Sequence, residues 1–251
     1  MIELQDLSVG YRGEPVLRGV NLAFRPGQVA VLLGPNGCGK STLLKTALGL
    51  LPALGGQVLY DGVPLGSLAP VQVARQAAYM AQSRSVPHIE ARRMVLHGRF
   101  PYLSFPRRYR PEDKQAVAQA MDEAGAADLA GCLMQELSGG QRQKVYLAMA
   151  LAQRTGTIFM DEPTTWLDVR HQLEVMATAR RLAAGGKAVA LVCHDLCLAL
   201  RNADTVALLA DGALRMTDTP DRVYESGALD AAFGVRVRRV EVDGSWQYFC
   251  E

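Results

Sequence analysis

The chain has 251 residues, of which 49% are hydrophobic and 21% are charged, a composition typical of a globular protein whose core needs no disulfide framework. The 27 Lys and Arg against 25 Asp and Glu give a formal net charge of +2, which argues against wholesale binding of nucleic acid or another polyanion. The longest apolar runs, such as residues 188–193, are much shorter than the roughly 18 residues of a membrane span. The acidic residues 1–6 do not resemble a signal peptide. We therefore expect that the chain by itself neither crosses a bilayer nor enters the secretory route.

In chain order, apolar and alternating runs predict strands and helices that take turns along most of the sequence. The expected strands are 2–9, 16–24, 29–33, 57–60, 77–80, 157–160, 187–192, 206–209, 213–217 and a terminal hairpin of 235–242 and 245–250. The expected helices are 40–50, 91–98, 111–124, 140–154 and 169–184, with an irregular stretch over 99–110. This alternation predicts a mainly parallel sheet, interrupted by a helical insertion in the middle of the chain.

The five cysteines are odd in number and scattered, which favours reduced thiols in a reducing compartment. Cys193, His194 and Cys197 are three possible metal ligands in one short run. Because no second paired ligand set accompanies them, we expect buried thiols there rather than a metal site.

A glycine-rich run between an expected strand and an expected helix matches the pattern G-x-x-x-x-G-K-[ST]. Converging backbone N–H groups at a helix N-terminus bind phosphate well, and glycine allows the loop to come close to it. We expect Lys40 to reach the β and γ phosphates and Ser41 to ligate Mg²⁺. The alternative is a βα turn without a ligand. The candidate ATP-binding residues of this cradle are Gly34, Pro35, Asn36, Gly37, Cys38, Gly39, Lys40, Ser41 and Thr42.

Two adjacent acids follow the apolar strand predicted over 157–160. Ligands bind at the carboxyl ends of strands in open α/β sheets, and successive residues point to opposite sides. We therefore assign Asp161 to the Mg²⁺ shell and Glu162 to the attacking water as general base. A solvated acidic turn is the alternative.

Residues 137–142 read LSGGQR and are expected to open a helix with Ser138 as its N-cap. This is a second helix terminus suited to an anion. In a symmetric dimer, the Ser138 turn of one chain would cap the γ-phosphate held by the cradle of the other. An ordinary capped helix explains the same residues.

With these motifs the chain resembles the nucleotide-binding subunits of ATP-binding cassette (ABC) transporters along nearly its whole length. The resemblance implies a P-loop NTPase (RecA-like) α/β core, an antiparallel β part at the N-terminus and an inserted α-helical subdomain. It also implies ATP and Mg²⁺ as ligands and a head-to-tail homodimer that closes on ATP. The residues that match the family's functional positions are Lys40, Asp161 and Glu162 of the Walker motifs, Ser138, Gly139, Gly140 and Gln141 of the signature, Gln82, His194, Tyr11 and Asp168.

The matched positions outside the Walker and signature motifs carry implied roles. Gln82 would join the Mg²⁺ shell with Ser41 and with Asp161, the last through water. Tyr11 would stack on adenine, and Asp168 would belong to the loop that follows the acids. His194 follows a strand expected beside that of Asp161, and so would lie near the γ-phosphate. Each has a plainer alternative when taken alone: an edge-strand aromatic for Tyr11, a strand-end polar residue for Gln82, a satisfied core histidine for His194.

Two further runs resemble importers of iron chelates, haem or cobalamin. They are residues 98–102 and the run of Thr164, Thr165, Trp166, Leu167 and Asp168, which is most like ferric-siderophore importers. Cys197 and Ala81 depart from that branch. The resemblance implies a peripheral ATPase on the cytoplasmic face of the inner membrane, with two permease subunits and a periplasmic or lipid-anchored binding protein. Haem or cobalamin import is the alternative, and a soluble non-transport ABC ATPase is less favoured.

The expected domain is single, with a core of residues 1–84 and 141–251 and a helical subdomain of residues 85–140 that ends in the signature. Residues 83–114 contain eight Lys and Arg against three acids. A solvated basic face explains them, and so does a dock for a permease helix beneath an anionic leaflet. In the dock, Phe100, Tyr102 and Phe105 would be apolar anchors.

Overall fold

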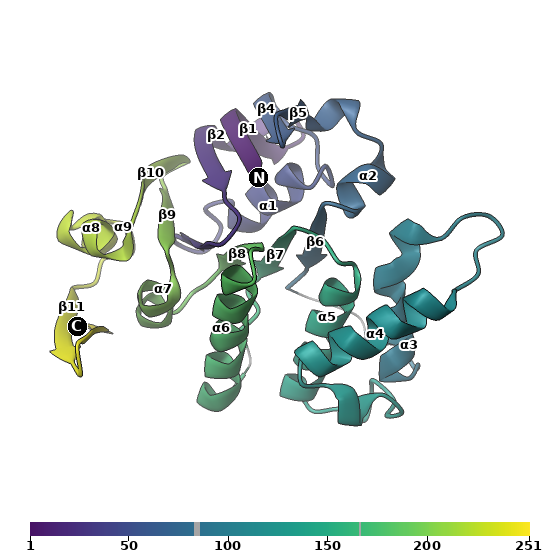
Figure 1. Cartoon of the computed structure of the whole chain (residues 1–251). Helices are drawn as coiled ribbons and strands as arrows, with labels where there is room; N and C mark the ends of the chain where they lie inside the picture. The colour runs from purple at the N-terminus through teal and green to yellow at the C-terminus, as the bar shows by residue number, and fades with distance from the viewer. Residues whose placement is uncertain (83–85, 166) are drawn as a thin grey trace.

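A computed structural model describes residues 1–82, 86–165 and 167–251. Figure 1 shows a twisted sheet through the middle of the molecule, a group of helices (α3, α4 and α5) at one end and the C-terminal elements at the other. The strands are β1 Ile2–Tyr11, β2 Glu14–Phe24, β3 Val29–Leu33, β4 Gly55–Tyr60, β5 Val63–Pro64, β6 Ala77–Met80, β7 Thr157–Asp161, β8 Ala188–Val192, β9 Thr205–Ala210, β10 Ala213–Asp218, β11 Val237–Val242 and β12 Ser245–Cys250. The α-helices are α1 Lys40–Ala47, α2 Pro70–Ala74, α3 Ala91–Leu96, α4 Pro111–Glu123, α5 Gly139–Ala152, α6 Val169–Ala184, α7 Leu196–Asn202, α8 Pro220–Glu225 and α9 Ala228–Phe233, with short 3-10 turns at η1 Leu65–Ser67, η2 His97–Tyr102 and η3 Ala127–Leu129.

Within the described residues, ten strands form one sheet in the order β5-β4-β1-β2-β10-β9-β3-β8-β7-β6. The half from β9 to β6 is parallel throughout. The half built from β1, β2, β4 and β5 is antiparallel. The predicted α/β class, with a mainly parallel core and an antiparallel N-terminal part, is confirmed.

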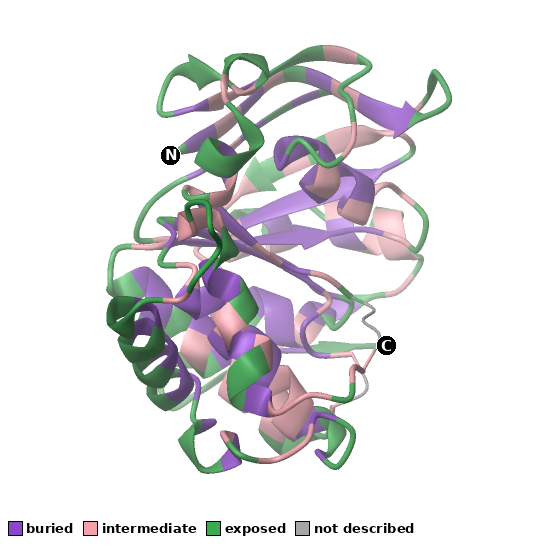
Figure 2. Ribbon diagram, turned by 90° about the vertical axis from the view of Figure 1, so that its right-hand side faces the viewer, coloured by how far each residue is buried: buried purple, intermediate pink, exposed green. Residues whose placement is uncertain are grey.

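The parallel strands are covered on both faces, which explains why their sequences are mostly apolar. All five residues of β3, β7 and β8 are buried, as is usual for strands packed between two layers. Figure 2 shows these strands as a buried band between elements whose outer faces are exposed. One core cluster joins the sheet to α5, α6 and α7, and a second joins it to α1 and the antiparallel strands. The carboxyl ends of β3, β7 and β8 are therefore held by a rigid frame.

The α3–η2–α4 region packs closely on α5. A Cβ at Gly98 would lie 2.2 Å from the Met149 carbonyl oxygen, so η2 rests directly on the backbone of α5. Arg99 is buried, pairs with Asp113 at 2.9 Å and donates to the Ala152 carbonyl at 2.8 Å. Arg99 therefore belongs to the interior, which corrects its place in the basic face expected over 83–114.

Several boundaries differ from the expected ones. The first helix ends at Ala47 rather than near residue 50. Helix α3 ends at Leu96 rather than at residue 98, and residues 97–102 form a 3-10 turn that covers the end of the expected helix and the start of the expected irregular stretch. The short elements β5, α2, α7, α8 and α9 were not predicted, because two to seven residues carry too little periodicity to be recognised. Helix α6 and strands β3, β6 and β12 have the expected bounds.

Replacing Arg99 with alanine is expected to destabilise the protein by about 3–5 kcal/mol, because the change leaves the Asp113 carboxylate buried without its partner. Burial opposes ionisation of Asp113, but the Arg110 backbone N–H and the Arg99 guanidinium outweigh it, and the pKa is lowered from its usual 3.8. The pair therefore stabilises the fold above that pH and less as the pH falls below it. Urea unfolding at pH 7 and pH 3 measures both effects.

The exposed Arg93 supplies the control: Arg93→Ala should change the free energy of unfolding by less than about 0.5 kcal/mol. An equal loss of stability in both variants would contradict this role of Arg99.

Candidate nucleotide-binding and hydrolysis site

The glycine-rich loop joins the end of β3 to the start of α1. Gly39 is the N-cap of α1 with φ 103°, a backbone conformation that side chains with a Cβ rarely adopt. At Gly34 a Cβ would lie 2.2 Å from the Leu209 carbonyl oxygen. The conformation of the turn therefore requires glycine at both positions. The loop brings its backbone to the N-terminus of α1, where a phosphate can be bound.

Lys40 is 5% exposed, and its ammonium lies within this loop. It donates to the Gly34 carbonyl at 2.7 Å and to the Pro35 carbonyl at 3.0 Å. Thr42 Oγ1 donates to the Tyr11 hydroxyl at 3.2 Å, which places the half-exposed ring of Tyr11 beside the cradle. The Lys40 ammonium, the glycine-rich loop and the Tyr11 ring therefore lie together at the N-terminal end of α1.

Ser41 and Asp161 meet at the carboxyl ends of β3 and β7. Ser41 Oγ donates to Asp161 Oδ1 at 2.8 Å, and the Tyr79 hydroxyl donates to Asp161 Oδ2 at 2.9 Å. A hydroxyl and a carboxylate are the hard oxygen donors that Mg²⁺ takes in nucleotide sites, so these side chains fit the ion. Tyr79 was missed as a site residue; its place one strand away from Asp161 was the available signal.

Glu162 is held at the centre of a polar cluster. Its Oε1 lies 2.5 Å from His194 Nε2, and its Oε2 accepts from Gln82 Nε2 at 2.5 Å and from Thr165 Oγ1 at 3.2 Å. Strands β7 and β8 are parallel neighbours with Asp161 opposite Val192, so the expected adjacency of the two strands is confirmed.

The backbone of Glu162 adds to this orientation. Its φ of 52° turns the chain sharply after β7 and separates the two acids. Asp161 stays buried against Ser41, while Glu162 turns towards Gln82 and His194. A carboxylate fixed in this way can accept a proton from a water molecule.

The Ser138 turn opens α5 as expected. Gln141 N–H donates to Ser138 Oγ at 3.3 Å, and Ser138 N–H donates to Gln141 Oε1 at 2.9 Å, which is a capping box. A Cβ at Gly139 would meet open space, whereas one at Gly140 would lie 2.6 Å from the His171 ring. Only glycine fits at position 140 because the His171 ring packs against it. Ser138 and Gly139 are exposed at the surface.

Asp168 caps the next helix. Its Oδ1 accepts from the His171 backbone N–H at 2.9 Å and lies 2.7 Å from His171 Nδ1. These contacts hold the pKa of Asp168 below its usual value. His171, which was not predicted, thus links the loop at Asp168 to the signature at Gly140. Trp166, part of the sequence run used above, lies outside the described residues.

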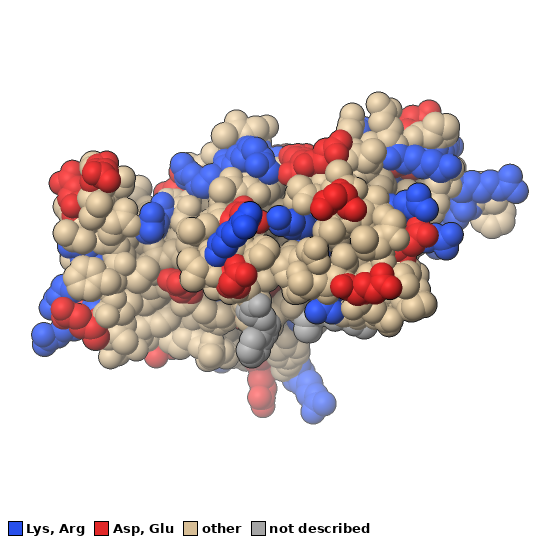
Figure 3. Space-filling model, turned by 90° about the horizontal axis from the view of Figure 1, so that it is seen from below, with Lys and Arg blue, Asp and Glu red and all other residues tan. Residues whose placement is uncertain are grey.

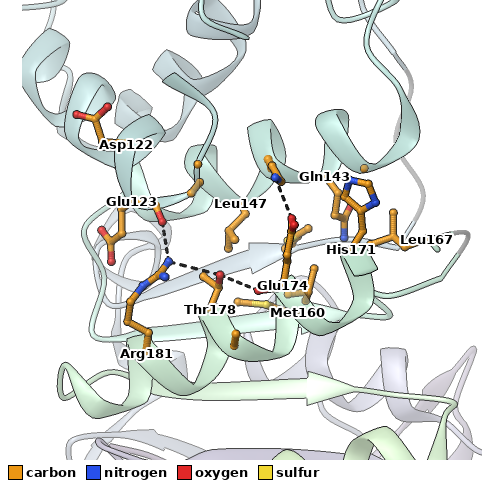
Figure 4. A pocket seen from close by; sticks show the side chains of 17 residues that line it. Asp122, Glu123, Gln143, Leu147, Met160, Leu167, His171, Glu174, Thr178 and Arg181 are labelled. Atoms are coloured by element: carbon orange, nitrogen blue, oxygen red, sulfur yellow. Dashed lines mark hydrogen bonds and ion pairs between the residues drawn. The ribbon is translucent and has the colours of Figure 1, made fainter. Parts of the chain in front are cut away.

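A hollow of about 300 Å³ lies between the end of α4, α5 and α6 (Figure 4). Lys144 and Glu174 pair across it at 2.9 Å, and Arg181 donates to the Glu123 carbonyl at 2.8 Å. Gly140 and His171 also line it. Since these contacts join α6 to α5 and to the end of α4, we interpret the hollow as a seam between these helices and not as the nucleotide site.

Cys193, His194 and Cys197 stand close together in the sequence, at the end of β8 and the start of α7. Among the described residues, no group of three or more His, Cys, Asp and Glu is arranged to hold a metal ion. Burial raises the pKa of Cys193 to about 11, so this residue is a neutral thiol. The part of the chain that the structure describes also contains no helix long and apolar enough to cross a membrane.

Together, the cradle, the hydroxyl–carboxylate pair and the oriented glutamate at one edge of a parallel sheet define a phosphate-binding nucleotide hydrolase. Comparison with known proteins gives the family. Residues 17–165 match the family model described as ABC transporter. The chain belongs to the ABC transporter family, and it is an ATP-hydrolysing subunit.

Similar proteins include importer ATPases. The chain is 36% identical over 234 residues to the ferric enterobactin transport ATP-binding protein FepC of Escherichia coli, covering 92% of this chain and 86% of that protein. It is 40% identical over 228 residues to the hemin import ATP-binding protein HmuV of Streptomyces coelicolor, covering 90% and 81%. A solved structure titled as an inward-facing putative metal-chelate type ABC transporter aligns with a TM-score of 0.87 and 25% identity, covering 100% of this chain and 97% of that one.

Proposed function

We propose that this chain hydrolyses ATP to power the import of a ferric siderophore across the bacterial inner membrane through a partner permease. The observation that carries the proposal is the match, along nearly the whole chain, to an ATP-binding protein of ferric enterobactin transport. Import of haem is the alternative, since a hemin import subunit is comparably similar.

In this proposal the residues of the cradle hold ATP. Backbone N–H groups of residues 34–42 and the Lys40 ammonium bind the phosphates, and Tyr11 stacks on adenine. Ser41, Gln82 and, through water, Asp161 would hold Mg²⁺, which neutralises charge that develops on the phosphate oxygens. The hydroxyl–carboxylate contact of Ser41 and Asp161 supports this assignment.

Glu162 is the proposed general base. Its carboxylate takes a proton from the attacking water, and His194 orients that water and contacts the γ-phosphate. The short contact between His194 Nε2 and Glu162 Oε1 supports a joint role. Gln82, which donates to the other oxygen of Glu162, would report the state of the site to the helical part of the chain.

We infer a homodimer in which the Ser138 turn of one chain completes the site of the other. Ser138 and Gly139 are exposed at the N-terminus of α5, and a helix N-terminus is suited to phosphate. Asp168 would lie at the same interface. Two copies related by a twofold axis would then enclose two ATP molecules.

The remaining partners follow from the family. Residues 1–84 and 141–251 would form the catalytic core, and residues 85–140 a helical subdomain that docks on the permease. Two permease subunits and a periplasmic or lipid-anchored binding protein would complete the importer, with the ATPase peripheral on the cytoplasmic face of the membrane. The proposal includes no nucleic acid.

The dock centres on Phe100 and the loop that follows. Phe100 is 52% exposed and stacks on His97 and Tyr109, and Phe105 is 96% exposed. Tyr102 is instead stacked under Arg99 and donates to the Gln153 carbonyl, so the structure removes it from the expected anchors. Figure 3 shows basic and acidic side chains mixed over much of the face seen from below, with basic ones projecting at the end that carries this loop.

Phe100→Asp is expected to abolish co-purification with the permease and to leave ATPase activity of the isolated subunit intact, because it places a charge at the centre of an apolar contact. The measurement is affinity capture of the co-expressed permease. Phe249→Asp, on the exposed face of the C-terminal hairpin, is the matched control. Retention of the permease by Phe100→Asp would contradict the dock.

The substrate is tested by growth of a strain that lacks this chain. We expect loss of growth on a ferric siderophore as sole iron source, rescue by the wild-type chain and no rescue by Glu162→Gln. Haem as iron source and a cobalamin-dependent growth assay are run in parallel. Growth lost only on haem would replace the siderophore with haem.

A further inference from the structure

The C-terminal hairpin carries a cysteine to the helix that follows His194. Cys197, in the first turn of α7, and Cys250, at the end of β12, are 53 residues apart, and their sulfur atoms lie 4.0 Å from each other. Cys197 is half-buried and Cys250 is exposed. The two sulfur atoms of a disulfide are about 2.05 Å apart. A small rotation of the two cysteine side chains would therefore bring these sulfur atoms within bonding distance.

The two elements that carry these cysteines are each anchored to their neighbours. Asp195 caps α7 by accepting from the Leu198 N–H at 2.9 Å, which fixes the turn of Cys197. The hairpin is fixed to α8 because Arg239 pairs with Asp221 at 2.8 Å and with Glu225 at 3.0 Å. Arg239 also lies over the rings of Tyr224 and Trp246. The two thiols are therefore close because α7 and the C-terminal hairpin are each anchored in the fold.

We propose that Cys197 and Cys250 form a reversible disulfide that ties the C-terminal hairpin to α7 and restrains His194. Hydrogen peroxide, or a peroxide of the same class, is the oxidant. The Cys250 sulfur attacks one peroxide oxygen and becomes a sulfenic acid, and its thiol proton joins the departing hydroxide to leave as water. Cys197 sulfur then displaces that oxygen, and the thiol proton and the hydroxyl leave as water. Overall, two thiols and one peroxide give one disulfide and two waters, and a dithiol reductant restores both thiols.

The environments of the two thiols give them different roles. Burial and the neighbouring Cys250 raise the pKa of Cys197 to about 11, so Cys197 is the neutral, resolving thiol. Cys250 lies at the surface, where the oxidant arrives first. Cys193 is buried, and its thiol donates to the Asp195 carbonyl at 3.4 Å, which keeps it apart from this exchange.

The consequence for ATP turnover depends on the proposed role of His194. Residue 194 is three positions before Cys197, and its ring contacts the proposed base. A bond from α7 to the hairpin would restrict the movement that the ring needs in order to follow the phosphate through hydrolysis. We therefore expect the oxidised form to turn over ATP more slowly, by roughly threefold, and to recover when it is reduced.

The test uses the full chain treated with hydrogen peroxide in the presence of Mg-ATP. Free thiols counted in denaturant should fall from five to three, and peptide mapping should join Cys197 to Cys250. A cross-link over so long a loop should raise the unfolding midpoint by roughly 5–15 °C. Cys197→Ser and Cys250→Ser should show none of these changes, and Cys132→Ser, the matched control, should still form the bond.

Three results would overturn the inference: five free thiols after treatment, a bond that maps to other cysteines, or a complete Cys197–Cys250 bond with unchanged ATP turnover. The thiol count and the peptide map do not depend on transport. Their failure would leave the proposed import function intact, whereas failure of the growth assay would leave the disulfide intact.

Discussion

Glu162→Gln is expected to bind Mg-ATP with near wild-type affinity and to lower the rate of ATP hydrolysis by on the order of 10²–10⁴-fold, the usual contribution of a general base. The amide is nearly the same size as the carboxylate, so it can keep contacts with His194, Gln82 and Thr165. It cannot accept the proton of the attacking water. The variant should therefore accumulate as an ATP-bound dimer, visible as a doubled mass in size-exclusion chromatography with light scattering.

The matched control is Glu112→Gln, which makes the same chemical change at an exposed position in the first turn of α4. It should hydrolyse ATP at the wild-type rate and form no trapped dimer. Normal turnover by Glu162→Gln would remove Glu162 as the base, and would direct attention to His194 as the group that activates water.

Lys40→Ala is expected to weaken binding of Mg-ATP by roughly 100-fold or more, which corresponds to about 2.7 kcal/mol. Lys40 is 5% exposed as a residue and its ammonium is already held by two loop carbonyls, so little entropy is lost when it binds a phosphate. Binding is measured with a fluorescent ATP analogue, and the unfolding midpoint is recorded to exclude a folding defect.

Lys45→Ala is the control, because Lys45 lies on the same helix beyond the cradle. It should leave nucleotide affinity within about twofold of wild type. Equal weakening in both variants would indicate that net charge near α1, and not the position of Lys40, governs binding.

The sequence predicted the central sheet because its strands are buried on both sides. Continuous apolar runs give β3, β7 and β8 without ambiguity, and the capped, amphipathic residues 169–184 give α6. The cradle was predictable for a related reason, since the conformations of Gly34 and Gly39 leave few other residues possible. The loop depends on the backbone conformation of a few neighbouring residues, and the strands depend on burial along one continuous segment, so both can be recognised in the sequence.

Features that depend on distant contacts were not predictable. Arg99 looks like a surface residue until Asp113 and the Ala152 carbonyl are brought to it by the packing of α4 and α5. The Tyr79 hydroxyl reaches Asp161 because β6 and β7 are neighbours, although they are about 80 residues apart in the chain. The same applies to Cys197 and Cys250, which meet only after α7 and β12 are packed.

We propose that ATP hydrolysis at Glu162 powers the import of a ferric siderophore. The most direct test of this proposal is the uptake of a radiolabelled ferric siderophore into membrane vesicles that contain the permease and this chain. The binding protein is supplied outside the vesicles, and Mg-ATP is supplied inside them. We predict accumulation with the wild-type chain and none with Glu162→Gln or without ATP. Accumulation of haem in place of the siderophore, or uptake that proceeds equally with Glu162→Gln, would contradict this account.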